Sequence, residues 1–415
     1  MTTARLRSER GAVLIHVGIA MIGLLGFCAL SIDYGVMWTA RRQAQNSADA
    51  AALAGAVSLA FVDRADTNRA RFAAEAAGEA NPIWGQAPNI DPASDIIIGT
   101  CPAGITNAID LCVRANVYRN QSHGNALPTF FANILGISSQ GVQATATARV
   151  LVGNSASCMR PWALTDKWYD LVDTDNPIEA TPTWTLDDKY ERYFENGPNR
   201  GQLKPGAVDC YHAALTNLQG PYMDNCPAGT PVTSFQVPRD VGTRVRMKSG
   251  NPSQALTAGW FFPIDLPIPS GPSTGGQRYS QNIATCNSLP VNIGDLLWTE
   301  PGNMIGPTNQ GVSALIAQDP GATWNGTEVV GGAFGVNNSP RIVPIPIFNI
   351  DAYYFQDKTS GRFQVQVTNI LGFFVEQMQG QDVTGILLPY RAQFNPSGAT
   401  VVANSSFLYS VVLVR

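Results

Sequence analysis

The strongest hydrophobic pattern in the chain lies at its beginning. From Ala12 to Ile32 there are 21 residues without Asp, Glu, Lys or Arg, and most are Leu, Ile, Val, Ala or Gly. A helix of this length can cross the apolar core of a bilayer. We expect a membrane-spanning helix over residues 12–32. The residues expected to anchor it in lipid are Ala12, Leu14, Ile15, Leu24, Leu25, Phe27 and Ile32.

The charges that flank this run predict its orientation. Arg5, Arg7 and Arg10 precede it, whereas Asp33 closes it. Because cationic residues stay on the cytoplasmic side, residues 1–11 are expected to form a cytoplasmic tail and the remainder to be exported. A cleaved signal peptide is the alternative, with Ala29 and Ser31 as a small-x-small site, but its apolar segment is normally shorter than this one.

An alanine-rich segment follows the apolar run. Residues 37–56 contain no proline and many alanines, so the membrane helix is expected to continue beyond the bilayer. Its small side chains allow another backbone to approach closely. Either a partner protein or the chain's own domain could pack there. The candidate partner-contacting residues are Ala44, Ala48, Ala51, Ala52 and Gly55.

The next hundred residues predict a small α+β unit. A helix is expected over residues 66–80, where Asn81-Pro82 ends it. Alternating apolar and polar residues predict strands over 95–98, 112–118 and 142–152, with a short helix over 128–136. Residues 33–155 should therefore form an α+β region in which a long helix packs on a small sheet.

A change of composition near Gly153 indicates a domain boundary, after which residues 156–415 are predicted to be mainly β. Strands are expected over 341–349, 361–371, 382–394 and 406–414, and an inserted helix over 308–317. Pro344 and Pro346 favour an edge position for the first of these strands. The predicted fold class is α+β, with a single N-terminal membrane helix that extends into a long helix packed on a small sheet, followed by a mainly β domain.

Composition narrows the possible partners. The 415 residues carry a net charge of −4 without a long run of Lys or Arg, which argues against nucleic acid as a partner. The charged fraction is 14%, and 39 Gly with 28 Pro favour a loop-rich body over a coiled coil. The chain is long enough for more than one hydrophobic core.

The cysteines favour an oxidising compartment. One of the seven, Cys28, lies in the apolar run, and none forms a Cys-x-x-Cys pair. The six others suggest up to three disulfides, although buried free thiols are the alternative. Six cysteines allow 15 connectivities. Sequence proximity pairs the candidates as Cys101 with Cys112, Cys210 with Cys226, and Cys158 with Cys286.

Catalytic and metal-binding patterns are weak. The exported histidines, His123 and His212, lie in no recognised catalytic motif. Residues 271–275 match Gly-x-Ser-x-Gly, but the surrounding prolines predict a loop rather than a strand-to-helix elbow. We expect no enzyme activity, no catalytic or metal-binding residues and no cofactor.

The segment from Trp162 to Asn199 leaves one ligand-binding alternative open. It places acidic residues among aromatic ones, which could form a sugar platform or a calcium site, whereas loop carboxylates beside core aromatics would explain the same residues. The acidic residues are Asp170, Asp173, Asp175, Asp187 and Asp188, and the aromatic ones are Trp162, Trp168, Tyr169, Trp184 and Tyr190.

The N-terminal region resembles a known family. Arg10-Gly11-Ala12 leading into the apolar helix, then Asp33-Tyr34-Gly35, Arg41 and the run from Gln45 to Ala56, resemble TadE/TadG-like proteins of the tight-adherence (Flp) pilus system. The segment from Leu127 to Ala148 is similar to the region beyond this helix in TadG-like members. In pilin-like members that a prepilin peptidase cuts, Glu stands where this chain has His16. The Asp-x-Ser-x-Ser run of a von Willebrand factor A metal site does not occur here.

The resemblance implies a non-enzymatic, membrane-anchored component of Tad/Flp-type pilus assembly or of an associated secretion machine. The implied location is the bacterial inner membrane, as a single-pass protein with a cytoplasmic N-terminus and a periplasmic bulk. The implied partners are the lipid bilayer and other pilus or secretion-machine proteins. An anchored carbohydrate-active or ligand-binding envelope protein is the alternative.

Overall fold

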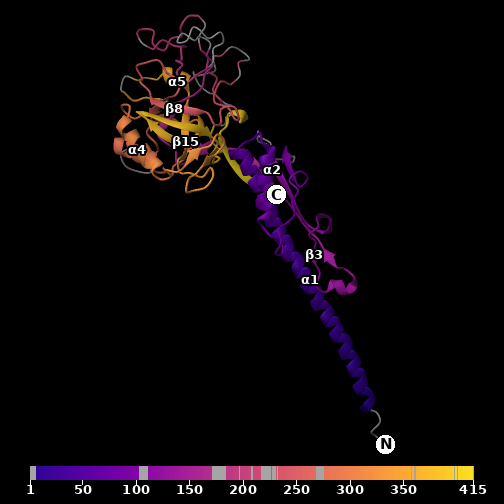
Figure 1. The fold of residues 1–415 in the computed structure, drawn as a ribbon. Helices are drawn as coiled ribbons and strands as arrows, with labels where there is room; N and C mark the ends of the chain where they lie inside the picture. The colour runs from indigo at the N-terminus through magenta and orange to yellow at the C-terminus, as the bar shows by residue number, and fades with distance from the viewer. Residues whose placement is uncertain are drawn as a thin grey trace.

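The computed structural model describes residues 6–101, 111–170, 184–195, 197–206, 209–215, 226, 230, 232–267, 275–356, 358, 361–396, 398–399 and 401–414. It is an α+β structure, as the sequence predicted (Figure 1). One long helix extends away from the rest of the molecule at the N-terminal end, and a mostly β body lies at the other end. We call residues 6–152 together with strand β18 (Leu408–Val414) the stalk region, and residues 155–405 the head region.

The stalk region is built on helix α1 (Leu6–Phe61), which runs without a break through the apolar run and the alanine-rich segment. Helix α2 (Thr67–Glu79) packs beside it, and the Asp66 side chain caps α2 by accepting the Arg69 N–H. The predicted helix over 66–80 is thereby confirmed.

A five-stranded sheet covers the other side of α1. Its order is β1 (Ile96–Gly99), β2 (Cys112–Arg119), β5 (Val142–Val152), β18 and β17 (Tyr390–Arg391). The strands β1, β2 and β5 lie where alternation predicted them. Between β2 and β5, a projecting hairpin contains the 3-10 helix η1 (Gln121–His123), β3 (Leu127–Pro128), the 3-10 helix η2 (Ala132–Leu135) and β4 (Ser139–Gln140).

The end of the chain returns to the stalk region. Strand β18 pairs antiparallel with β5, from Tyr409 opposite Val152 to Val414 opposite Thr147. Successive side chains in a strand point to opposite faces, and here Leu408 lies in a head-region core whereas Tyr409 lies in the stalk-region core. The boundary predicted between residues 155 and 156 stays a prediction. The five-stranded sheet contains strands from before this boundary (β1, β2 and β5) and from after it (β17 and β18).

The head region contains a ring of six paired strands. They are β7 (Trp162–Thr165), β8 (Arg244–Ser249), β9 (Trp260–Pro263), β14 (Ile342–Phe348), β15 (Gln364–Gln379) and β16 (Asp382–Leu388). The order β15-β14-β7-β9-β8-β16 closes because β16 also pairs with β15, and β11 (Leu296–Trp298) adds to β15. Alternate side chains from all six strands, Trp162 and Phe373 among them, form one core.

The edge position predicted for residues 341–349 is wrong, because β14 lies inside this ring. The prolines are accommodated because β14 pairs with only one neighbouring strand where they lie. Pro344 and Pro346 lie opposite β15, whereas the pairing with β7 involves Ile347 and Phe348. A proline lacks the N–H that a second neighbour would need.

The other head-region elements cover this ring. The predicted helix over 308–317 is confirmed as α4 (Ile305–Ile316), which packs with α3 (Gly276–Ala284). Two short strand pairs join β6 (Ser155–Ala156) with β10 (Val291–Asn292) and β12 (Thr323–Trp324) with β13 (Val329–Val330). The remaining elements are α5 (Ile350–Tyr354) and the 3-10 helix η3 (Ala403–Ser405).

Candidate functional site: membrane helix, stalk region and groove

Helix α1 is, in the part of the chain that the structure describes, the one helix long and apolar enough to cross a membrane. The predicted anchor side chains Leu14, Ile15, Leu24, Leu25, Phe27 and Ile32 are all exposed, with exposed fractions between 48% and 75%. Ala12 belongs to the same helix, and its side chain lies outside the described ones. A helix surface made of exposed apolar side chains is favourable in contact with lipid and unfavourable in contact with water.

The alanine-rich face of α1 is covered by the chain itself. Ala44, Ala48, Ala51, Ala52 and Gly55 are all buried in the stalk-region core. In this structure they pack on the chain's own domain, which is the alternative that the sequence leaves open, and their use as a partner surface stays a prediction. The physical reason is their size, because small side chains let α2 and the sheet approach the backbone of α1 closely.

Gly55 shows how close this approach is. A Cβ atom placed on it would lie 2.8 Å from Val113 Cγ1 on β2 and 3.2 Å from the Ala70 carbonyl oxygen on α2. On α2, a Cβ on Gly78 would likewise lie 3.2 Å from Ala51 Cβ. The Ser47 hydroxyl donates to the Gly78 carbonyl at 2.8 Å across the same contact.

Asp33, the residue that ends the apolar run, holds the projecting hairpin. Its carboxylate accepts backbone N–H groups from Phe130 at 2.8 Å, Phe131 at 3.1 Å and Ala132 at 2.7 Å. The bond from Phe130 contributes most to lowering the pKa of Asp33, and the other two add to it, whereas burial opposes them. Asp33 thus stays ionised and fixes the start of η2 against α1.

The six cysteines that follow the apolar run form three disulfides. The bridges join Cys101 to Cys112, Cys158 to Cys286 and Cys210 to Cys226, which is the pairing that sequence proximity favoured. Cys28 is free and exposed on the apolar part of α1. Disulfides are stable in exported compartments, which agrees with a head region outside the cytoplasm.

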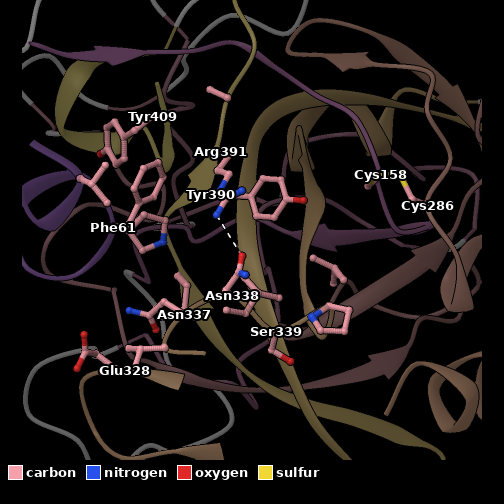
Figure 2. A pocket seen from close by; sticks show the side chains of 18 of the residues that line it. Phe61, Cys158, Cys286, Glu328, Asn337, Asn338, Ser339, Tyr390, Arg391 and Tyr409 are labelled. Carbon is pink, nitrogen blue, oxygen red and sulfur yellow. Dashed lines mark hydrogen bonds between the residues drawn. A yellow bond between two sulfur atoms is a disulfide. The ribbon is translucent and has the colours of Figure 1, made fainter. Parts of the chain in front are cut away.

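A groove of about 1060 Å³ lies where the C-terminal end of α1 meets the head region (Figure 2). Phe61 from α1 and Tyr409 from β18 form one side, with ring centroids 6.5 Å apart. On the other side, Arg391 donates to the Asn338 side-chain oxygen at 3.2 Å. The Cys158–Cys286 bridge forms part of the wall.

A buried arginine supports this wall. Arg160 donates to the carbonyl oxygens of Cys158 at 2.9 Å and Thr285 at 2.8 Å, so it connects the two chain segments that the disulfide joins. Burial lowers the pKa of Arg160 to about 10, which leaves it charged at neutral pH. The groove combines apolar rings with amide and guanidinium groups, so it offers both apolar contact area and hydrogen-bonding groups.

Where the acidic and aromatic segment is described, most of its aromatic side chains are buried or partly buried, whereas Tyr169 is 49% exposed. Trp162, Trp168 and Tyr190 are buried, and Trp184 packs partly buried against their cores. Asp170 is buried as well, whereas the Asp188 carboxylate accepts the Thr185 hydroxyl at 2.6 Å. Asp173 and Asp175 lie outside the described residues. Where the chain is described, no cluster of three or more His, Cys, Asp or Glu could hold a metal ion.

The histidines have local structural contacts. His123 stacks on Tyr118 with ring centroids 4.5 Å apart, and its Nδ1 lies 3.0 Å from the Asn120 side-chain oxygen. His212 Nδ1 lies 3.2 Å from the Thr230 carbonyl oxygen. Residues 271–274 of the Gly-x-Ser-x-Gly match lie outside the described residues.

Two features of the structure were missed by the sequence reasoning. The contact of Asp33 with a distant loop is not predicted from the sequence, although a carboxylate at a helix exit can cap backbone N–H groups of such a loop. Arg69 on α2 forms an ion pair with Glu328 of the head region, across the junction of the two regions. No local pattern in the sequence predicts a contact between residues so far apart along the chain.

Comparison with known proteins finds a similarity for one part of the chain. No curated protein and no solved structure matches it. The match that exists covers α1 from its apolar run to the end of the alanine-rich face, together with Asp33. Residues 11–58 match the family described as "Putative Flp pilus-assembly TadE/G-like", so this part of the chain is similar to members of that family.

Proposed function

We propose that this chain is a non-enzymatic component of Tad/Flp-type pilus assembly, or of an associated secretion machine, anchored in the bacterial inner membrane. The observation that carries the proposal is the family match over residues 11–58, which coincides with the candidate membrane helix. The proposed partners are lipid and other pilus or secretion-machine proteins.

The proposed orientation places the N-terminus in the cytoplasm and the stalk and head regions in the periplasm. Arg5, Arg7 and Arg10 before the apolar run support this side for the N-terminus. Three disulfides beyond the run support an oxidising compartment for the rest.

The shape favours a structural role over a catalytic one. Helix α1 passes without a break through the apolar run and ends beside the head region (Figure 1), so one continuous helix connects the membrane segment to the junction of the two regions. The groove there offers a surface of suitable chemistry for a partner segment. The buried state of Trp162, Trp168 and Tyr190 removes much of the support for the carbohydrate-binding alternative.

A deletion and complementation experiment tests the proposal. The gene is deleted and restored on a plasmid, and surface pili are counted by electron microscopy together with surface adhesion. We expect pili to be lost on deletion and to return with the plasmid. Unchanged pili and adhesion in the deletion strain would contradict the proposal.

A further inference from the structure

The projecting hairpin of the stalk region lies at the level where the apolar run of α1 ends. Asp33 binds three consecutive backbone N–H groups at the start of η2, so the loop of residues 129–138 is fastened to this turn of α1. In Figure 1 the hairpin that contains β3 extends along α1 toward the N-terminus. Its tip is therefore directed toward the membrane-spanning part of the helix.

The tip of this hairpin exposes large apolar side chains. Phe130, Phe131, Ile134 and Ile137 have exposed fractions of 54%, 39%, 81% and 53%. The chain from Gly124 to Ala148 contains no Asp, Glu, Lys or Arg. Clustered apolar side chains on a segment that has no charged residue of its own are unfavourable in water and mark an interaction surface.

The depth of the tip follows from the geometry of α1. Residues 13–32 rise by about 30 Å at 1.5 Å per residue, which is the thickness of the apolar core of a bilayer. Asp33 and the bound loop then lie at the boundary of that core. Tyr34 and Trp38, both exposed on α1 within five residues of Asp33, then lie in the headgroup region, where aromatic residues are enriched in membrane proteins.

We propose that residues 129–138 form a second membrane contact, in which Phe130, Phe131, Ile134 and Ile137 insert into the interface between headgroups and acyl chains. The partner is phospholipid, in the leaflet where α1 leaves the bilayer. This surface is continuous with the exposed apolar side chains of α1, and segments of this kind bury their apolar face about 5–10 Å deep. Two contacts, joined by Asp33, would fix the tilt and rotation of the stalk region relative to the membrane.

The inference rests on the membrane anchoring in the proposed function, and the test separates the two. The full chain carries Cys28→Ser, so that a single new cysteine can be labelled with the environment-sensitive fluorophore NBD. The label is placed at Ile134→Cys, at Leu25→Cys in the apolar run, or at Phe334→Cys, an exposed head-region position. The proteins are reconstituted in vesicles of phosphatidylethanolamine and phosphatidylglycerol, with or without lipids that carry a doxyl quencher near the headgroup end of the acyl chain.

We expect the doxyl lipids to quench the label at position 134 by at least about twofold and aqueous iodide to quench it little, as for an interfacial side chain. The label at position 334 should show the opposite response. If position 25 is quenched by doxyl lipid while position 134 responds as position 334 does, the anchor stands and the loop contact is disproved. If neither position is quenched by doxyl lipid, both ideas fail.

A third response would also overturn the inference. Protection of position 134 from iodide without quenching by doxyl lipid would show that protein, in this preparation a second copy of the chain, covers the loop. As a positioning test, Asp33→Ala should reduce the doxyl quenching at position 134, because three N–H groups lose their acceptor. Quenching at position 25 should stay unchanged in that variant.

Discussion

The stalk and head regions achieve close packing by opposite means. More than half of the stalk-region core residues are alanines, on α1, α2 and the sheet, so backbones approach one another closely. The head-region cores are filled by large rings, with Trp162, Phe261 and Phe373 inside the strand ring. Stability should therefore depend on keeping side chains small in the stalk region and on keeping them large in the head region.

Truncation inside the strand ring should have one of the two largest effects. Trp162 is fully buried and its ring meets that of Phe261 edge to face at 6.3 Å. Trp162→Ala should lower the free energy of unfolding by about 3–5 kcal/mol, because a large cavity remains. Hydrogen exchange of the full chain should show the loss in β7 and β14 amides, with β2 and β5 unchanged. Equal losses in both regions would show that the two cores unfold as one.

The disulfides test the same comparison, because they close loops of different length in the two regions. The head-region bridge Cys158–Cys286 spans 128 residues, whereas the stalk-region bridge Cys101–Cys112 spans 11. By the loop-entropy relation, removing the first should cost roughly 5 kcal/mol and removing the second roughly 3 kcal/mol. Paired Cys→Ser variants measured by guanidinium unfolding of the oxidised full chain would test this order. A larger loss for the short loop would show that native contacts, not chain entropy, dominate.

Overpacking should be the specific weakness of the stalk region. Gly55→Leu should cost about 1–3 kcal/mol, since even its Cβ would lie 2.8 Å from Val113 Cγ1. The gain in helix propensity of about 1 kcal/mol would not offset a severe clash. Val57→Leu is the matched control, because Val57 is exposed on the same helix. Thermal unfolding should separate the two variants, and equal stability would mean that α2 can move aside.

How far the sequence predicts the structure also differs between the two regions. In the stalk region the apolar run, the alanine spacing and the alternation over 142–152 each act locally, so helix and strands were found close to their true bounds. In the head region the closure of the ring depends on the pairing of β15 with β16 and β14, which no local pattern encodes. Pro344 and Pro346 were correctly taken to restrict pairing, but one-sided pairing does not require the outer edge of a sheet.

In the candidate site too, local features were predicted from the sequence and contacts between distant residues were not. The sequence located the membrane helix and the cysteine pairs, since composition and spacing carry them. It left the packing of Ala48 and Gly55 undecided, because a small-residue face does not specify what covers it. The contact of Asp33 with residues 130–132 joins positions about a hundred residues apart, and it depends on how the hairpin folds back along α1.

Two carboxylates should give the two regions opposite pH dependences. In the head region, burial raises the pKa of Asp166 to about 6, although the hydroxyls of Ser234 and Tyr211 each donate to it at 2.8 Å. In the stalk region, the Phe130 N–H and its neighbours lower the pKa of Asp33. A raised carboxyl pKa stabilises the fold below the ordinary value of 3.8, and this stability is lost as the pH rises through about 6. A lowered pKa contributes stability above 3.8 that is lost as the pH falls through the folded pKa.

Hydrogen exchange as a function of pH can separate these contributions. Between pH 7 and about 4.5, acidification should strengthen the protection of head-region amides, and Asp166→Asn should remove that part of the dependence. The amides of Phe130 and Ala132 should lose protection from exchange only at lower pH. In the Asp33→Asn variant, their protection should already be weaker at neutral pH. A common pH profile for both sets of amides would contradict the assignment of one carboxylate to each region.

The smallest expected effect concerns the ion pair that connects the two regions. Arg69 on α2 meets Glu328 between β12 and β13, and both side chains retain some exposure, 37% and 16%. Partly exposed pairs contribute about 0.2–1 kcal/mol, because water and salt screen them. A double-mutant cycle with Arg69→Ala and Glu328→Ala, measured at low and high salt, should give a coupling energy in this range that falls as salt increases. The shared sheet, rather than this pair, would then hold stalk and head regions together, since β18 connects their cores through Leu408 and Tyr409. A coupling well above 1 kcal/mol that resists salt would instead show that the two regions meet through a dry, preorganised contact at the ion pair.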